Sequence, residues 1–246
     1  MRPASASPAT RAVAAFACTA ALFLLPLAPL PAPAAPLAAQ STDDGKGTVP
    51  PEDWGKWESL AGSALSPDGS WLAVQIRRVD EDGELRIRPV GNPDSVVTVP
   101  NGSGARFSAD GRWLAYVIGV GEDQRERLQD QDRPVRNSVG LLDLRSGDTT
   151  SVEAVASFAF SPDGRWLAMQ RYAPRGERDA RGMDLVVRDL EGGRDTNFGS
   201  IAEFAWSDVG PLLALLVDAE GMAGNGIQLY DAGTRRLVTL DSKSAR

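Results

Sequence analysis

The chain has 246 residues, with 26 lysines and arginines against 33 aspartates and glutamates, one cysteine and no histidine. Without histidine it cannot form a Ser-His-Asp or Cys-His catalytic group or a histidine-ligated metal centre. A single cysteine excludes an intrachain disulfide and a thiolate metal cluster. The net charge of −7 argues against a nucleic-acid partner, which would favour a basic surface. We therefore expect no catalytic residue, metal site or cofactor in this chain, and the sequence identifies no substrate-binding residue.

Residues 1–39 have the pattern of a secretory signal peptide. Arg2 and Arg11 are the only charges in the first forty residues, and an apolar run at residues 12–25 leads into a Pro/Ala-rich stretch. We expect cleavage after Ala39, which would export the chain to the periplasm or the extracellular space. The alternative, an uncleaved membrane anchor, is weaker because prolines interrupt the run before the ~20 apolar residues that a span requires. The mature chain would then be free of cysteine and of membrane association.

Four copies of one ten-residue pattern occupy the rest of the chain. The copies are LSPDGSWLAV at 65–74, FSADGRWLAY at 107–116, FSPDGRWLAM at 160–169 and a degenerate WSDVGPLLAL at 206–215. Their serines are 42, 53 and 46 residues apart. Repeats of ~40–50 residues with strand content are typical of propeller blades.

Each copy combines a turn with a strand. In the first copy, proline fixes φ at the second turn position and glycine occupies the fourth, as in a type I turn. The strand that follows is apolar at consecutive positions, which favours a sheet buried on both faces. The alanine of each strand keeps one position small where neighbouring sheets are expected to be closest. The predicted structural turn residues are Ser66, Pro67, Asp68, Gly69, Ser108, Asp110, Gly111, Ser161, Pro162, Asp163 and Gly164.

The pattern predicts an all-β fold, namely a β-propeller of at least four four-stranded blades, and an incomplete one. After each repeated strand come a polar connection, a second apolar strand, a tight turn and a short closing strand. One blade cannot bury its own faces, so the copies must stack. We place a linker and a short capping helix at residues 40–62 and the propeller at 63–246, with blades at about 63–100, 105–155, 156–199 and 201–241.

Two further segments lead to structural expectations. The charged connection at residues 121–137 is either a recognition arm over the propeller mouth or a solvated, salt-bridged hairpin extension, and the second is favoured. Acidic residues at 80–82 and 130–132 lack the spacing of a calcium loop.

Trp54, Trp57 and Leu60 are expected on one side of a short helix that begins at Pro51 and packs on the blades.

The segment PEDWGKWESL at 51–60, followed by LSPDGSWLA, resembles the start of secreted bacterial prolyl oligopeptidase family serine peptidases. The resemblance extends over about residues 49–241. It implies an N-terminal propeller of seven or eight blades that admits short peptides to a C-terminal α/β-hydrolase domain in cis.

The chain departs from that family because it has no Gly-x-Ser-x-Gly nucleophile elbow and no histidine. No catalytic residue is therefore transferred to it, and we expect the chain to be catalytically inert and to be the front part of a longer protein or a truncated gene product. The alternative function is a periplasmic interaction propeller resembling the scaffold of the Tol translocation system. That family places an α/β domain before its blades, whereas about two dozen residues separate signal and blade here.

Overall fold

The computed structural model describes residues 50–79, 82–173, 181–219 and 224–242. All of them belong to one unit, Thr48–Arg246. The predicted signal peptide and its cleavage site lie outside the described residues, as does part of the acidic stretch at 80–82.

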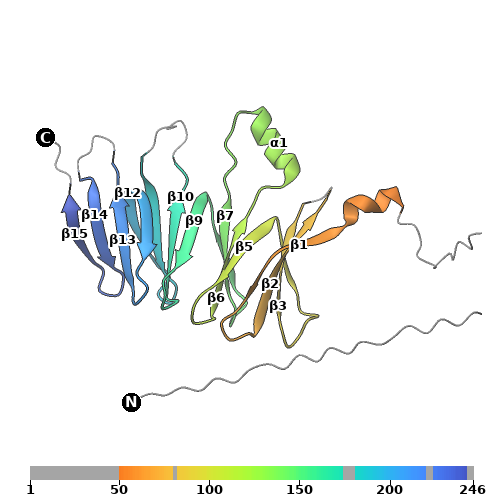
Figure 1. Ribbon diagram of the computed structural model, residues 1–246, viewed down its shortest axis with the longest axis horizontal. Helices are drawn as coiled ribbons and strands as arrows, with labels where there is room; N and C mark the ends of the chain where they lie inside the picture. Colours follow the sequence, from red (N-terminus) through yellow and green to blue (C-terminus); the bar gives the residue numbers. More distant parts are fainter. Residues whose placement is uncertain (1–49, 80–81, 174–180, 220–223, 243–246) are drawn as a thin grey trace, which may run out of the picture. The chain divides into compact units, whose positions relative to one another are not determined.

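The first two blades are separate four-stranded antiparallel sheets, each with its strands in chain order. A short 3₁₀ helix, η1 (Pro51–Lys56), precedes them. Blade 1 comprises β1 (Glu58–Leu65), β2 (Trp71–Arg78), β3 (Glu84–Pro89) and β4 (Val97–Pro100). Blade 2 comprises β5 (Gly102–Phe107), β6 (Trp113–Ile118), β7 (Ser138–Asp143) and β8 (Thr149–Val152). The predicted four-stranded antiparallel unit is therefore confirmed (Figure 1).

Blades 3 and 4 share one long strand and so form a single seven-stranded sheet. The shared strand, β12 (Arg194–Trp206), pairs with β11 through its first part and with β13 through its second. Between the two parts, Ser200 has a φ of +58°, where the chain passes from one blade to the next. The other strands are β9 (Val155–Phe160), β10 (Trp166–Arg171), β11 (Met183–Asp189), β13 (Leu212–Val217), β14 (Gly226–Asp231) and β15 (Arg236–Ser242).

Three hydrophobic clusters hold neighbouring blades together. Successive side chains of a strand point to opposite faces, so in β10 Ala168 packs toward blade 4 and Leu167 toward blade 2. Leu85 and Ile87 of blade 1 likewise meet Leu114 of blade 2. This explains why the repeated strand is apolar at consecutive positions.

The two ends of the blades carry different connections. The repeated turns between the first and second strands lie at one edge of the sheets, which we call the turn edge (Figure 1). The connections between the second and third strands lie at the opposite edge, which we call the loop edge. The long connection of blade 2 is at the loop edge, where it forms α1 (Glu122–Asp130).

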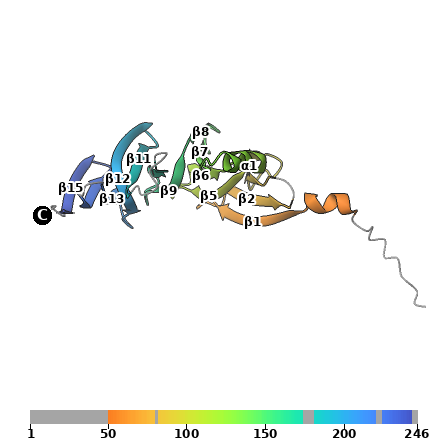
Figure 2. The ribbon, with the colours of Figure 1, turned by 90° about the horizontal axis from the view of Figure 1, so that it is seen from above.

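The prediction of a hairpin extension at 121–137 is wrong, because this segment contains an α-helix. Glu122 and Asp123 occupy its first turn and Arg127 its last, which complements the helix dipole. Glu122 also pairs with Arg125 one turn later. The expectation that this segment is solvated is confirmed, since no residue of α1 is buried. Seen from above, α1 lies beside the strands of blade 2 (Figure 2).

The expected packing of the N-terminal helix on the blades is not observed. The segment does begin a helix at Pro51, but Trp54 and Trp57 are 57% and 56% exposed. Leu60 lies beyond the helix in β1 and is 78% exposed. An apolar stripe predicted from helical spacing therefore buries little surface here, because only six residues are helical and the chain continues as a strand.

Two adjacent leucines of β13 test the packing between blades. Leu215 is fully buried against blade 3, whereas Leu216 points to the other face and is 40% exposed. We expect Leu215→Ala to lower the free energy of unfolding by about 2–5 kcal/mol, because it leaves a cavity, and Leu216→Ala by less than about 1 kcal/mol. Urea unfolding of both variants, followed by tryptophan fluorescence, checks this; equal losses would contradict the assignment of the faces.

Candidate functional site

The predicted turn residues form the same hydrogen-bonded arrangement in blades 1, 2 and 3. In blade 1, Gly69 donates its N–H to the Ser66 carbonyl at 2.9 Å and has a φ of +72°. The Ser66 hydroxyl donates to Asp68 Oδ1 at 2.6 Å and accepts the Trp71 N–H at 2.9 Å. The equivalent bonds join Ser108 to Asp110 and Trp113, and Ser161 to Asp163 and Trp166. Each serine is buried with its hydroxyl satisfied, so its role in the turn is structural.

The repeated turns of blades 2 and 3 also pack against the turn of the preceding blade. A Cβ placed on Gly164 would lie 2.9 Å from Asp110 Oδ1 and 3.0 Å from the Asp110 amide nitrogen. Gly164 also has a φ of +74°, so both its conformation and its closeness to Asp110 require glycine. The turn residues found by sequence repetition are thus brought together across blades at the turn edge.

A second repeated feature was missed by the sequence analysis. The arginine that follows the turn glycine forms an ion pair with the aspartate at the end of the third strand of its blade. Arg112 Nη2 lies 2.9 Å from Asp143 Oδ2, and Arg165 Nη2 lies 3.5 Å from Asp189 Oδ2. The available signal was the aspartate that ends the third strand in blades 2, 3 and 4, namely Asp143, Asp189 and Asp231.

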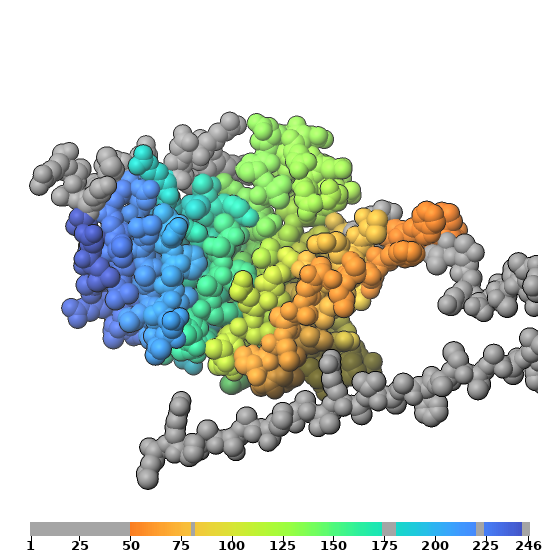
Figure 3. Space-filling view, in the orientation of Figure 1, coloured from red at the N-terminus to blue at the C-terminus, as the bar shows by residue number. Residues whose placement is uncertain are grey.

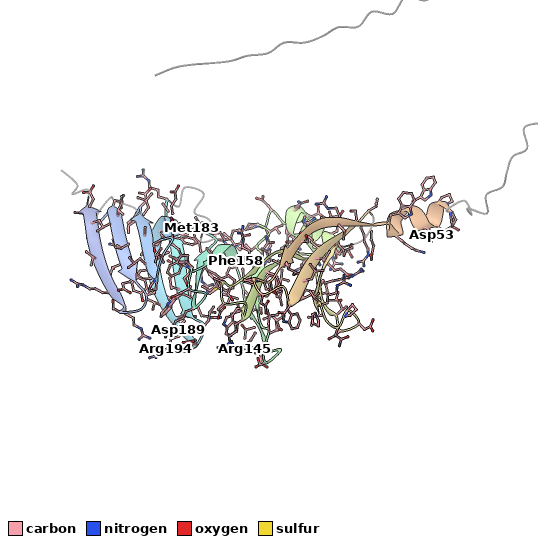
Figure 4. All side chains as sticks on the ribbon, turned by 60° about the horizontal axis from the view of Figure 1, so that its bottom comes forward. Asp53, Arg145, Phe158, Met183, Asp189 and Arg194 are labelled. Carbon is pink, nitrogen blue, oxygen red and sulfur yellow. The ribbon has the colours of Figure 1, made fainter. Side chains whose placement is uncertain are left out.

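These two aspartates also fix the turns that follow them. The Asp143 carboxylate accepts the Arg145 N–H at 2.9 Å, and that of Asp189 accepts the N–H of Glu191 at 3.1 Å. Burial alone would raise their pKa values, but hydrogen bonds from backbone N–H groups and the arginine guanidinium outweigh it and hold both pKa values below their ordinary range. Figure 4 shows these turns at the turn edge, where Asp189, Arg194 and Arg145 lie. Met183, at the other end of β11, lies far from them.

The outward face of blade 4 is apolar and exposed. Leu216, Ile227 and Val238 are 40–44% exposed. Register places Leu216 opposite Ile227, on the face that carries Ala214. The matching alanines of blades 1–3, Ala73, Ala115 and Ala168, are at most 1% exposed because the next blade covers them. Blade 4 thus presents the kind of surface that the other blades bury.

The outward face of blade 1 combines apolar and charged surface. Leu65 of β1 is 59% exposed. At the other end of β1, Glu58 accepts hydrogen bonds from Arg78 and Arg86, each at 2.7 Å, and Arg86 also binds Glu84. These bonds lower the pKa of Glu58, while exposure to solvent keeps each of them weak.

The serine–aspartate pair of the first repeated turn is poorly suited to catalysis. Ser66 and Asp68 are within hydrogen-bond distance, but bonds from the hydroxyls of Ser66 and Ser70 and from the Ser70 N–H lower the pKa of Asp68 to about 2. Such a carboxylate is a poor general base at neutral pH. In the described ranges no three Asp, Glu or Cys side chains lie close enough together to hold a metal ion. No helix among those residues is long and apolar enough to cross a bilayer.

No family model and no curated protein sequence matches the chain. Several solved structures resemble its fold. One is a prolyl endopeptidase, with a TM-score of 0.50, 14% identity and coverage of 76% of this chain and 29% of that one. The β-propeller domain of the Trilobed protease from Pyrococcus furiosus gives 0.48 at 14% identity, covering 77% and 59%. An acylaminoacyl peptidase bound to a chloromethyl ketone also gives 0.48 at 14% identity, covering 77% and 33%.

These similarities show the fold. Together with the repeated antiparallel sheets, the prolyl endopeptidase match identifies the described chain as β-propeller blades, as the sequence predicts. The chain spans 59% of the length of the Trilobed protease propeller and about a third or less of each peptidase.

The hydrogen bonds to Asp68 make stability depend on pH. Its pKa is about 2 in the folded chain against an ordinary 3.8, so ionised Asp68 favours folding above pH ~4, and this contribution disappears as the pH falls through 2. We expect Asp68→Asn to be less stable than the wild type at pH 7, by an amount that shrinks on acidification. Urea midpoints measured from pH 7 to pH 2 check this, with Asp94→Asn in an exposed loop of the same blade as control. A difference that does not change with pH would contradict it.

Proposed function

We propose that this chain is the N-terminal propeller part of an exported, prolyl oligopeptidase-like serine peptidase, with an α/β-hydrolase domain following in cis. The observation that carries the proposal is the start of the blades: PEDWGKWESL at 51–60 leads directly into the first repeat, as in that family. The repeated blades and their apolar outward face at Leu216, Ile227 and Val238 support it, because such a face is normally covered by a further blade.

In this proposal the propeller restricts access to the hydrolase active site and leaves the chemistry to the other domain. The described side chains suit that division of labour, since their serine–aspartate pairs stabilise turns. Peptide hydrolysis would belong to the full-length protein. Export to the periplasm or the extracellular space is part of the proposal and rests on the signal-like residues 1–39.

The genomic reading frame provides the first test. We expect coding sequence beyond Arg246 that adds further Ser-x-Asp-Gly repeats, then a Gly-x-Ser-x-Gly elbow and a downstream histidine. A frame that ends without a hydrolase domain would remove the support for this function.

The isolated chain and the full-length protein should differ completely in activity. We expect residues 40–246 to give no turnover of a proline-containing chromogenic peptide, because neither nucleophile elbow nor histidine is present. The full-length protein should hydrolyse the same peptide, and its elbow Ser→Ala variant should not. Turnover by the isolated chain above the rate of a mock purification would contradict this reading.

A further inference from the structure

A polar pocket of about 300 Å³ lies between blades 1 and 2 at the loop edge. It is formed by the end of β2, the start of β5, the end of β6 and the first turns of α1. The space-filling view shows α1 standing above this part of the molecule (Figure 3). The polar residues that line it are Gln75, Arg77, Asn101, Ser103, Arg125 and Asn137.

Backbone hydrogen bonds between the two blades hold the walls of the pocket in place. Asn101, with a φ of +54°, donates its N–H to the Gly83 carbonyl at 2.8 Å and accepts the Gly119 N–H at 2.9 Å. A Cβ on Gly83 would lie 2.7 Å from the Ile76 carbonyl oxygen, so the chain passes closely there. The pocket is therefore preformed, which reduces the entropy lost when a ligand binds.

Asp82 fixes the start of α1 at the rim. Its Oδ1 accepts the Glu122 N–H at 2.9 Å, and its Oδ2 accepts Asn101 Nδ2 at 3.3 Å. Arg125, one turn into the helix, donates from Nη2 to the Val120 carbonyl at 3.1 Å and pairs with Glu122. The Asp82 carboxylate is thus engaged in holding the helix, and the Arg125 guanidinium is held at the pocket wall.

The lining has positive charge and hydrogen-bond donors. Among the described residues that line it there are two arginines and no aspartate or glutamate, although the chain as a whole carries a net charge of −7. The guanidinium of Arg77 is exposed, and within the ranges that the structure describes it makes no hydrogen bond or ion pair. Its neighbour Arg78, by contrast, is paired with Glu58 and Glu84.

We propose that this pocket binds a carboxylate group of a peptide, with Arg77 as its main contact. A guanidinium offers two parallel N–H donors that match the two oxygens of a carboxylate. The side chains of Gln75, Ser103 and Asn137 supply neutral donors around it. The volume lies at the lower end of the range for ligand pockets, which suits a small group better than a whole oligopeptide.

The carboxylate could come from the C-terminus of the peptide or from an acidic side chain. The choice of a peptide as ligand rests on the proposed function, whereas the preference for a carboxylate rests on the pocket itself. Binding is measured on the isolated chain, whereas the proposed function is tested by the reading frame and by the activity of the full-length protein. Failure of the binding proposal is therefore distinguishable from failure of the proposed function.

Isothermal titration calorimetry at low salt with three peptides tests the proposal. The peptides are acetyl-Ala-Ala-Ala with a free C-terminus, the same peptide amidated, and amidated acetyl-Ala-Glu-Ala. We expect binding of one or both peptides that carry a carboxylate and at least tenfold weaker binding of the amidated Ala peptide. Binding of the free-terminus peptide alone identifies the C-terminus as the source, and binding of the glutamyl peptide alone identifies the side chain.

Three variants locate the binding. Arg77→Ala should weaken it at least tenfold, and Arg77→Lys, which keeps the charge but loses the paired donors, should lie between Arg77→Ala and wild type. Arg88→Ala, which removes a β3 arginine that does not line the pocket, should bind as the wild type does. Thermal unfolding confirms that each variant is folded. No binding of any peptide, equal binding of the amidated Ala peptide, or unchanged affinity in Arg77→Ala would overturn the proposal.

Discussion

Burial of each sheet between its two neighbours is the constraint on which the rest of this structure depends. A four-stranded blade exposes apolar side chains on both faces, and each buried leucine or valine contributes roughly 1.5–3 kcal/mol only when another blade covers it. The alanine at the centre of each repeated strand keeps the sheets close enough for this packing. Ala73, Ala115 and Ala168 are almost completely buried, whereas Ala214 on the outward face of blade 4 is only half-buried.

The stacked sheets have two edges whose connections differ: the repeated turns at the turn edge have one length, and the connections at the loop edge vary in length. At the turn edge, Gly164 approaches Asp110 of the preceding blade so closely that the turns must keep their conformation. At the loop edge the connections between second and third strands differ in length, and blade 2 accommodates a nine-residue helix there without burying any of its residues. Neighbouring connections also approach closely at this edge, since a Cβ on Gly182 would lie 2.8 Å from the Asp218 carbonyl oxygen. The longest of these connections, that of blade 2, lies next to the pocket.

Most of the strong polar contacts in the described chain serve its architecture. Ser66, Ser108 and Ser161 satisfy the backbone of the turns, and Asp143 and Asp189 join an arginine to the turn that follows. Because these groups are engaged with one another, they have little capacity left for chemistry on a substrate. The pocket at the loop edge differs, since Arg77 lines it and its guanidinium makes no hydrogen bond or ion pair within the described ranges.

The sequence by itself determined the blade unit, because Ser-x-Asp-Gly turns and consecutive apolar positions recur with their spacing intact and reflect local backbone rules. It also excluded histidine-based chemistry outright. Only the tertiary structure decided which face each residue meets, that residues 122–130 are helical, and that Trp54 and Trp57 remain exposed. Only the tertiary structure likewise brought Arg77 and Arg125, nearly fifty residues apart, to one pocket. These outcomes depend on contacts between blades, whose partners lie far apart in the chain and leave no periodic signal within it.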